Sequence, residues 1–167
     1  AENKVLEENK EFPLAGSYRG YYRLATSGVE MPQATNANRY EHNFAYESTA
    51  YSKGAVFLGQ LSYIIGQDKL FETLQTYYNE WKFKHPLPND LRVIAERVSG
   101  IQLQWYLTDW TQTTNTIDYA IEAVNTTEYG TEIHLERKEL MPMPQEVLIQ
   151  FKDGSTALHY IPISLMR

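Results

Sequence analysis

The sequence predicts an α+β fold in which four or five helices precede about four antiparallel strands. Up to about residue 116 the apolar residues recur at helical spacing, and beyond that point they alternate with polar residues as in half-buried strands. Asp153-Gly154 lies between two alternating segments and is the strongest hairpin signal in the chain. These observations divide the chain into a helical part, residues 1–115, and an antiparallel β part, residues 116–167.

The clearest predicted helix covers residues 49–65. Ser48 or Thr49 is its expected N-cap, an apolar stripe follows at helical spacing, and Gly66 ends it. Residues 30–44 contain Pro32, several Asn and few aliphatic residues, so we expect a long ordered loop, a kind of segment that is often functional. The other predicted helices cover residues 18–27, 69–83, 89–98 and 103–110.

The predicted strands cover residues 117–121, 131–137, 146–151 and 156–161. Pro142 and Pro144 interrupt backbone pairing and are typical of a sheet edge or a connection. A sheet of four strands has two faces and open edges, so we expect this part to belong to a larger β-sandwich.

The composition argues against several classes of protein. The 167 residues carry a net charge of -6, and no cluster of Lys and Arg indicates a nucleic-acid partner. No apolar run approaches the roughly 18 residues of a membrane span. The chain has no cysteine, which excludes disulfides, thiolate nucleophiles and Cys-based zinc sites. Residues 1–11 are charged and do not resemble a signal peptide. We expect any export signal to lie upstream of them, so the compartment of the parent protein stays open.

The histidines do not form a recognisable metal motif. No two of them lie four residues apart on a helix, so the zinc motif His-Glu-x-x-His is absent, and we expect no ligand role even for His42 in the long loop. The sequence also lacks a Gly-x-Ser-x-Gly elbow, a phosphate loop and a dinucleotide fingerprint. By itself, the chain therefore lacks a complete catalytic constellation. The four histidines are His42, His85, His134 and His159.

One stretch resembles a known family. Tyr46 is followed five residues later by the motif Tyr51-Ser-Lys53-Gly54, at the start of an apolar run. This pattern resembles a signature of the aminopeptidase N family of zinc metallopeptidases, the gluzincin aminopeptidases. Shorter motifs follow in the family's order, so the resemblance covers about residues 18–167. They are Tyr77-Tyr78-Asn79-Glu80-Trp81, Asn89-Asp90-Leu91, Ala95-Glu96, Ser99-Gly100 and Trp110.

The resemblance implies a fold and an activity. Residues 1–115 would form the helical C-terminal half of a thermolysin-like catalytic domain, and residues 116–167 part of the β-sandwich that follows it. The parent protein would be a zinc aminopeptidase that hydrolyses N-terminal residues from peptide substrates by metal-activated water.

The resemblance also implies roles for single residues. Tyr51 matches the tyrosine whose hydroxyl donates a hydrogen bond to the tetrahedral oxyanion, and Tyr46 matches a supporting tyrosine. Lys53 and Gly54 match the motif without an expected catalytic role. Glycine inside a helix is unfavourable, so Gly54 predicts close packing against another element. Without the family context, Tyr51 would be interpreted as a core-packing residue.

In that family the zinc-binding helix, the third zinc ligand and the Gly-rich exopeptidase motif precede the stretch that this chain resembles. We therefore expect zinc in the parent protein, but none bound by this chain, which we expect to hydrolyse nothing by itself. Helix faces that would pack against the missing half are expected to be exposed and to promote self-association. The alternative is a non-catalytic protein-interaction module or an inactive relative.

Overall fold

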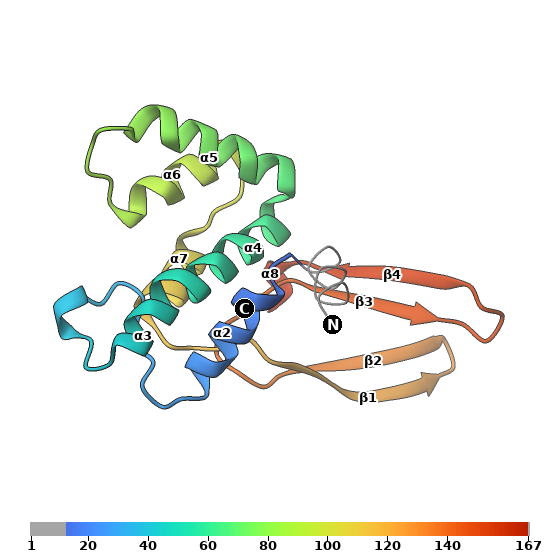
Figure 1. The fold of residues 1–167 in the computed structure, drawn as a ribbon. Helices are drawn as coiled ribbons and strands as arrows, with labels where there is room; N and C mark the ends of the chain where they lie inside the picture. Colours follow the sequence, from blue (N-terminus) through green and yellow to red (C-terminus); the bar gives the residue numbers. More distant parts are fainter. Residues whose placement is uncertain (1–12, 167) are drawn as a thin grey trace, which may run out of the picture. The chain divides into compact units, whose positions relative to one another are not determined.

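The structure is a computed structural model that describes residues 13–166 (Figure 1). Its helices are followed by four antiparallel strands, which confirms the predicted α+β class. The chain divides into two compact units, Ala1–Thr114 and Asn115–Arg167, which are described separately below. The charged residues 1–11, where we expected no signal peptide, lie outside the described residues.

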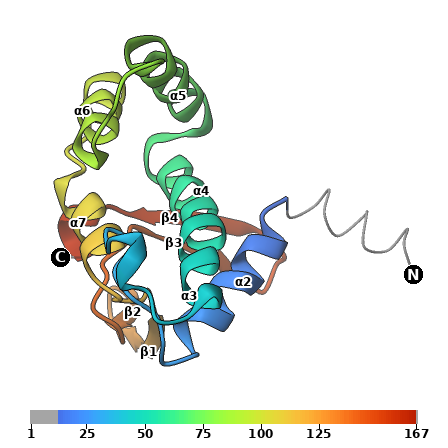
Figure 2. The same cartoon turned by 60° about the vertical axis from the view of Figure 1, so that its left-hand side comes forward.

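The first unit is helical. The helices predicted at 18–27, 69–83, 89–98 and 103–110 are all present, with ends that differ by at most three residues. Helices α5 and α6 lie side by side as an antiparallel pair (Figures 1 and 2). The elements are α2 (Ala15–Ala25), η1 (Ala37–Arg39), α3 (Asn43–Glu47), η2 (Ser48–Lys53), α4 (Gly54–Ile65), α5 (Gln67–Trp81), α6 (Pro88–Ser99) and α7 (Gln104–Gln112).

The helix predicted from residue 49 begins earlier and is not regular. Elements α3, η2 and α4 follow one another without a break and form one continuous rod (Figure 2). Ser48 and Thr49 lie buried within this rod, so the prediction that either residue caps the helix is wrong. Element η2 is a π-helical turn, in which the backbone bonds from i to i+5. The stretch before residue 49 has no apolar stripe in the sequence, and in the structure Tyr46 within it packs against Tyr40 of the preceding loop.

Short-range caps define the ends of α6 and the start of α7. Pro88 occupies the first turn of α6, and the Asp90 carboxylate accepts a hydrogen bond from the Leu87 N–H at 2.7 Å. Gly100 ends α6 in the left-handed conformation, with φ of 76°. The Glu96 carboxylate then accepts a hydrogen bond from the Leu103 N–H at 2.7 Å, which ties the end of α6 to the start of α7.

An aromatic cluster forms the centre of the helical core. The rings of Phe57, Tyr106 and Trp110 contact one another, with Tyr106 at centroid separations of 5.1 Å from Phe57 and 5.9 Å from Trp110. Tyr21 contacts Trp110 at 5.6 Å. The Tyr106 hydroxyl donates a hydrogen bond to the Phe57 carbonyl at 2.5 Å. Burial raises the pKa of Tyr106 well above its usual range, so this phenol stays a neutral donor. The cluster joins α2, α4 and α7.

The second unit contains two antiparallel hairpins. Strand β1 (Tyr119–Thr127) pairs with β2 (Gly130–Arg137), β3 (Gln145–Gln150) pairs with β4 (Thr156–Ile161), and the short helix α8 (Ile163–Met166) follows. The predicted turn at Asp153-Gly154 is confirmed: Gly154 has φ of 86°, and the Asp153 carboxylate accepts hydrogen bonds from the N–H and hydroxyl of Ser155. Pro142 and Pro144 lie in the connection between β2 and β3, as predicted.

The first strand is longer than the predicted 117–121. A register shift between Ile121 and Ala123 moves the later residues of β1 to the other face, which hides their alternation in the sequence. On the second hairpin, Leu148 and its cross-strand partner Leu158 are both exposed. One face of that hairpin therefore carries uncovered apolar side chains within this unit.

None of the helices within residues 13–166 combines the length and the hydropathy that crossing a bilayer requires.

Helix α2 approaches the π-helical turn so closely that its Gly20 leaves no room for a side chain. A Cβ at Gly20 would lie 2.9 Å from Ser52 Cβ, whereas a Cβ at Gly16 in the same helix would meet nothing within 4 Å. We expect Gly20→Ala to lower the free energy of unfolding by about 1–3 kcal/mol through overpacking. Gly16→Ala is the matched control, and we expect it to raise that free energy by up to about 1 kcal/mol. Urea unfolding of both variants tests this; equal effects would contradict the close approach.

Candidate functional site

The candidate site is the surface around η2, where residues 30–42 lie against the helical rod. The predicted loop at 30–44 is confirmed as ordered and mostly irregular: η1 is its one short turn of helix, and α3 takes its last two residues. The backbone N–H of Ala34 donates a hydrogen bond to the Thr111 carbonyl at 2.8 Å, which fixes the loop to α7. The Gln33 side-chain amide donates to the Thr49 carbonyl at 3.4 Å, which fixes it to η2.

A buried ion pair joins the start of this loop to the end of η2. The Lys53 ammonium lies 2.7 Å from a Glu30 carboxylate oxygen, and the two side chains are only 0% and 7% exposed. The ammonium also lies 3.4 Å from the Thr113 carbonyl and 5.9 Å from the centre of the Tyr21 ring. A buried charge needs such partners, because removing it from water costs several kcal/mol. Burial, and then the negative charge of Glu30, raise the pKa of Tyr21 well above its usual range.

Tyr51 lies within η2, two residues before Lys53, and the residue is 77% exposed. The interpretation of Tyr51 as a core-packing residue is therefore wrong for the described part of the chain. Lys53, for which we expected no catalytic role, is fully buried. The turn thus holds a buried cation on one side and an accessible phenol on another.

Tyr46 lies in α3 and is 44% exposed. Its ring packs edge-on against that of Tyr40 with a centroid distance of 5.5 Å, and the Tyr40 hydroxyl donates to the Pro32 carbonyl at 3.3 Å. In a regular α-helix, residues five apart point about 140° away from one another. A π-helical turn takes more residues per turn and so reduces this offset between Tyr46 and Tyr51.

Gly54 does not show the predicted close packing. Among the described residues, the nearest atom to a Cβ built at Gly54 would be the Gln33 side-chain nitrogen at 3.5 Å, an ordinary van der Waals distance. Close approach is found instead at Gly20 on α2, against Ser52, and at Gly59 on α4, against the end of the Leu14 side chain.

The part of the chain from residue 13 to residue 166 contains no group of three or more His, Asp or Glu side chains that could hold a metal ion. His42 is exposed and immediately precedes α3, where its side chain does not cap the helix. The candidate site therefore offers hydroxyl and amide groups, rather than a set of metal ligands.

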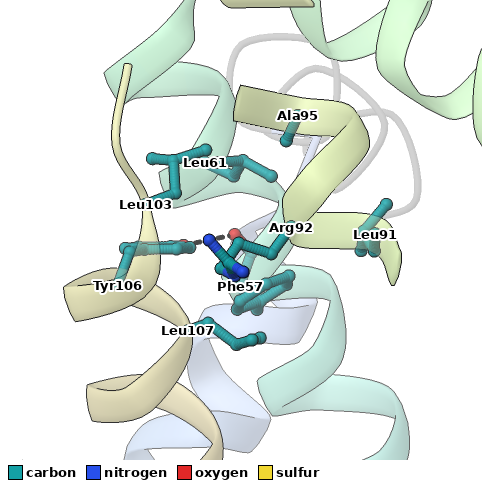
Figure 3. A pocket seen from close by; sticks show the side chains of 8 residues that line it. All are labelled: Phe57, Leu61, Leu91, Arg92, Ala95, Leu103, Tyr106 and Leu107. Atoms are coloured by element: carbon teal, nitrogen blue, oxygen red, sulfur yellow. Dashed lines mark hydrogen bonds between the residues drawn. The ribbon is translucent and has the colours of Figure 1, made fainter. Parts of the chain in front are cut away.

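Two hollows lie beside the aromatic core. The smaller has a volume of about 10 Å³, between α4, α6 and α7, and has room for about one water molecule (Figure 3). The larger, of about 280 Å³, is an open apolar groove that borders the loop at Gln33 and Ala34. Neither hollow brings together side chains with an evident catalytic role. The groove is lined by Gln33, Ala34, Phe57, Pro88, Leu91, Leu107 and Thr111.

Glu30 is the site residue that the sequence did not reveal. It lies 23 positions before Lys53, in a loop without periodicity, so no spacing rule connects the two residues. The one available signal was Lys53 itself, a cation inside a segment that leads into an apolar helix.

Comparison with protein-family models matches residues 20–110 to the Peptidase family M1 domain, which is more than half of the chain. The matched range contains Glu30, Tyr46, Tyr51 and Lys53. No curated protein matches the chain at a significant level.

The buried pair predicts a large effect on stability. Glu30→Ala leaves the Lys53 ammonium buried without its counter-charge, and we expect the free energy of unfolding to fall by about 3–5 kcal/mol. Glu80→Ala is the matched control, because Glu80 pairs with Arg97 where both side chains are about half exposed. Its expected cost is at most about 1 kcal/mol. Denaturant unfolding measures both, and similar losses in the two variants would contradict the buried pair.

Proposed function

The chain belongs to peptidase family M1, and on that premise we propose that it forms part of a zinc aminopeptidase in which Tyr51 stabilises the transition state. The parent protein would remove N-terminal residues from peptides by hydrolysis. Within it, the Tyr51 hydroxyl would donate a hydrogen bond to the oxygen of the scissile carbonyl, while Tyr46 would support the arrangement.

The observation that carries this proposal is the exposure of Tyr51 on an otherwise well-anchored turn. A large aromatic side chain that contributes little to the core of its own unit can contact a substrate or another part of the parent protein. Its backbone lies between Thr49 and Lys53, both of which make tertiary hydrogen bonds. A donor held in this way can face a developing charge without reorganising during the reaction.

The chemistry of the phenol fits this role. When water adds to the carbonyl carbon of a peptide bond, the carbonyl oxygen acquires negative charge. A phenol O–H donates a hydrogen bond to such an oxygen more strongly as that charge develops. One donor of this kind is typically worth about 3–4 kcal/mol of the activation barrier.

The family implies a zinc ion in the parent protein, and the described residues do not fit it. Catalytic zinc is usually held by three protein ligands, whereas residues 13–166 contain no cluster of three candidate side chains. We propose that the ligands belong to other parts of the parent protein and that this chain by itself neither holds zinc nor hydrolyses peptides. One tightly bound zinc per purified chain, together with aminopeptidase activity, would contradict this.

The reading frame upstream of Ala1 tests the same proposal at the level of the gene. We expect it to encode a His-Glu-x-x-His segment, which supplies two zinc ligands and a general base. A complete frame without that segment would instead favour an inactive relative or a protein-interaction module.

In the full-length protein, we expect Tyr51→Phe to lower kcat by roughly two to three orders of magnitude, because it removes the donor and keeps the ring. Steady-state hydrolysis of an aminoacyl chromogenic substrate measures the effect. The matched control is Tyr78→Phe, which removes the hydroxyl of another exposed tyrosine, on α5, and should leave kcat unchanged. A Tyr51→Phe enzyme that keeps more than half of its activity would refute the role.

A further inference from the structure

We propose that Lys53 is a positioning residue: its ion pair with Glu30 holds η2 in the π-helical register and so determines where the Tyr51 hydroxyl lies. This inference rests on the proposed function of Tyr51. It gives a positioning role to Lys53, which has no catalytic role of its own, and to Glu30, which lies outside the motif.

The π-helical turn at η2 is a rare backbone conformation. Backbone bonds from i to i+5 are rare outside single turns within α-helices, and such turns occur frequently at functional sites. The segment Ser48–Lys53 is flanked by regular helix on both sides, so an α-helical register is its obvious alternative. Contacts between η2 and residues outside the rod must therefore favour the π-helical turn over the α-helical one.

The contacts of Lys53 come from residues outside the rod. Lys53 is the last residue of η2, and its ammonium is held by the Glu30 carboxylate at 2.7 Å and the Thr113 carbonyl at 3.4 Å. Both partners come from outside the rod, one preceding it and one following α7 in the chain. A change of register would rotate Lys53 about the rod axis and pull its ammonium away from these partners. Tyr51 lies in the same turn and would rotate with it.

Ionic contacts constrain orientation more than they raise stability. A buried pair contributes little net stability compared with apolar residues of similar size, because desolvation offsets the attraction. Its hydrogen bonds nevertheless require particular positions of donor and acceptor, which an apolar side chain at residue 53 would not require. The Gln33 bond to the Thr49 carbonyl restrains the beginning of the same turn, so η2 is held near both ends.

The test replaces the pair in the full-length protein by apolar residues of similar size, Glu30→Leu with Lys53→Met. Because such replacements are often neutral, we expect this apolar-pair variant to fold and to unfold within a few degrees of the wild type. We expect kcat to fall at least tenfold with KM within twofold, since the substrate still binds while Tyr51 is misplaced. A variant that keeps kcat within twofold of the wild type would overturn the inference.

A double-mutant cycle separates a role through Tyr51 from a general structural effect. In a Tyr51→Phe background the hydroxyl is already absent, so we expect the apolar replacement of the pair to change kcat by less than twofold further. An equal loss in both backgrounds would overturn the positioning role and leave the proposed function of Tyr51 intact. A Tyr51→Phe enzyme with full activity would instead refute the proposed function itself.

Two additions keep this cycle decisive. If the apolar-pair variant does not fold, Glu30→Gln takes its place, because it retains an acceptor for Lys53 but removes the charge. We expect Glu30→Gln to lower kcat by about threefold to tenfold in the wild-type background. In the Tyr51→Phe background it should again change kcat by less than twofold. The matched control is Glu80→Leu with Arg97→Met, which removes an exposed pair of the same unit and should leave kcat unchanged in both backgrounds. A loss of kcat in this control as large as that of the apolar-pair variant would count against a specific effect of the buried pair.

Discussion

The arrangement of the helical unit around its candidate site depends on one buried ion pair. The Lys53 ammonium is completely removed from solvent, so the structure must supply a counter-charge, and Glu30 supplies it from a loop that has no regular structure to order it. Three segments therefore contact one another around the Lys53 ammonium: the loop, the rod of α3, η2 and α4, and the residue after α7. Further along the loop, the hydrogen bonds of Gln33 and Ala34 attach it to η2 and to α7.

The consequences of this pair reach both the core and the surface. On the core side, Glu30 lies close enough to Tyr21 to influence its ionisation, and Tyr21 belongs to the aromatic cluster that joins α2 to α7. On the surface side, Tyr51 projects from the same turn into solvent. A well-packed interior thus supports an accessible phenol, which is the arrangement expected of a donor that acts on a bound substrate. The family match adds the chemical context in which such a donor is useful.

Much of the fold could be predicted from local pattern. Helices α5, α6 and α7 carry apolar stripes with nearby breakers such as Gly66 and Gly100, and the Asp153-Gly154 turn produces the hairpin that its residue types favour. Local rules failed where long-range contacts decide the outcome. The start of the rod was placed six residues too late because the segment before Thr49 has no apolar stripe and contacts the loop through the rings of Tyr46 and Tyr40. The end of β1 was missed because a bulge reverses its alternation.

Local sequence patterns were sufficient to predict the α+β class, the order of the elements and the motif of Tyr46, Tyr51, Lys53 and Gly54, because each depends on residues close together in the chain. Tertiary structure decided which residues of that motif are buried and which face solvent. Lys53 points into the interior because the Glu30 carboxylate, 23 positions earlier in the chain, pairs with it there. No pattern in the sequence of the polar loop identifies Glu30 as that partner. The π-helical register has the same origin, since hydrogen bonds and an ion pair from outside the rod act on a turn whose own sequence is compatible with an ordinary helix.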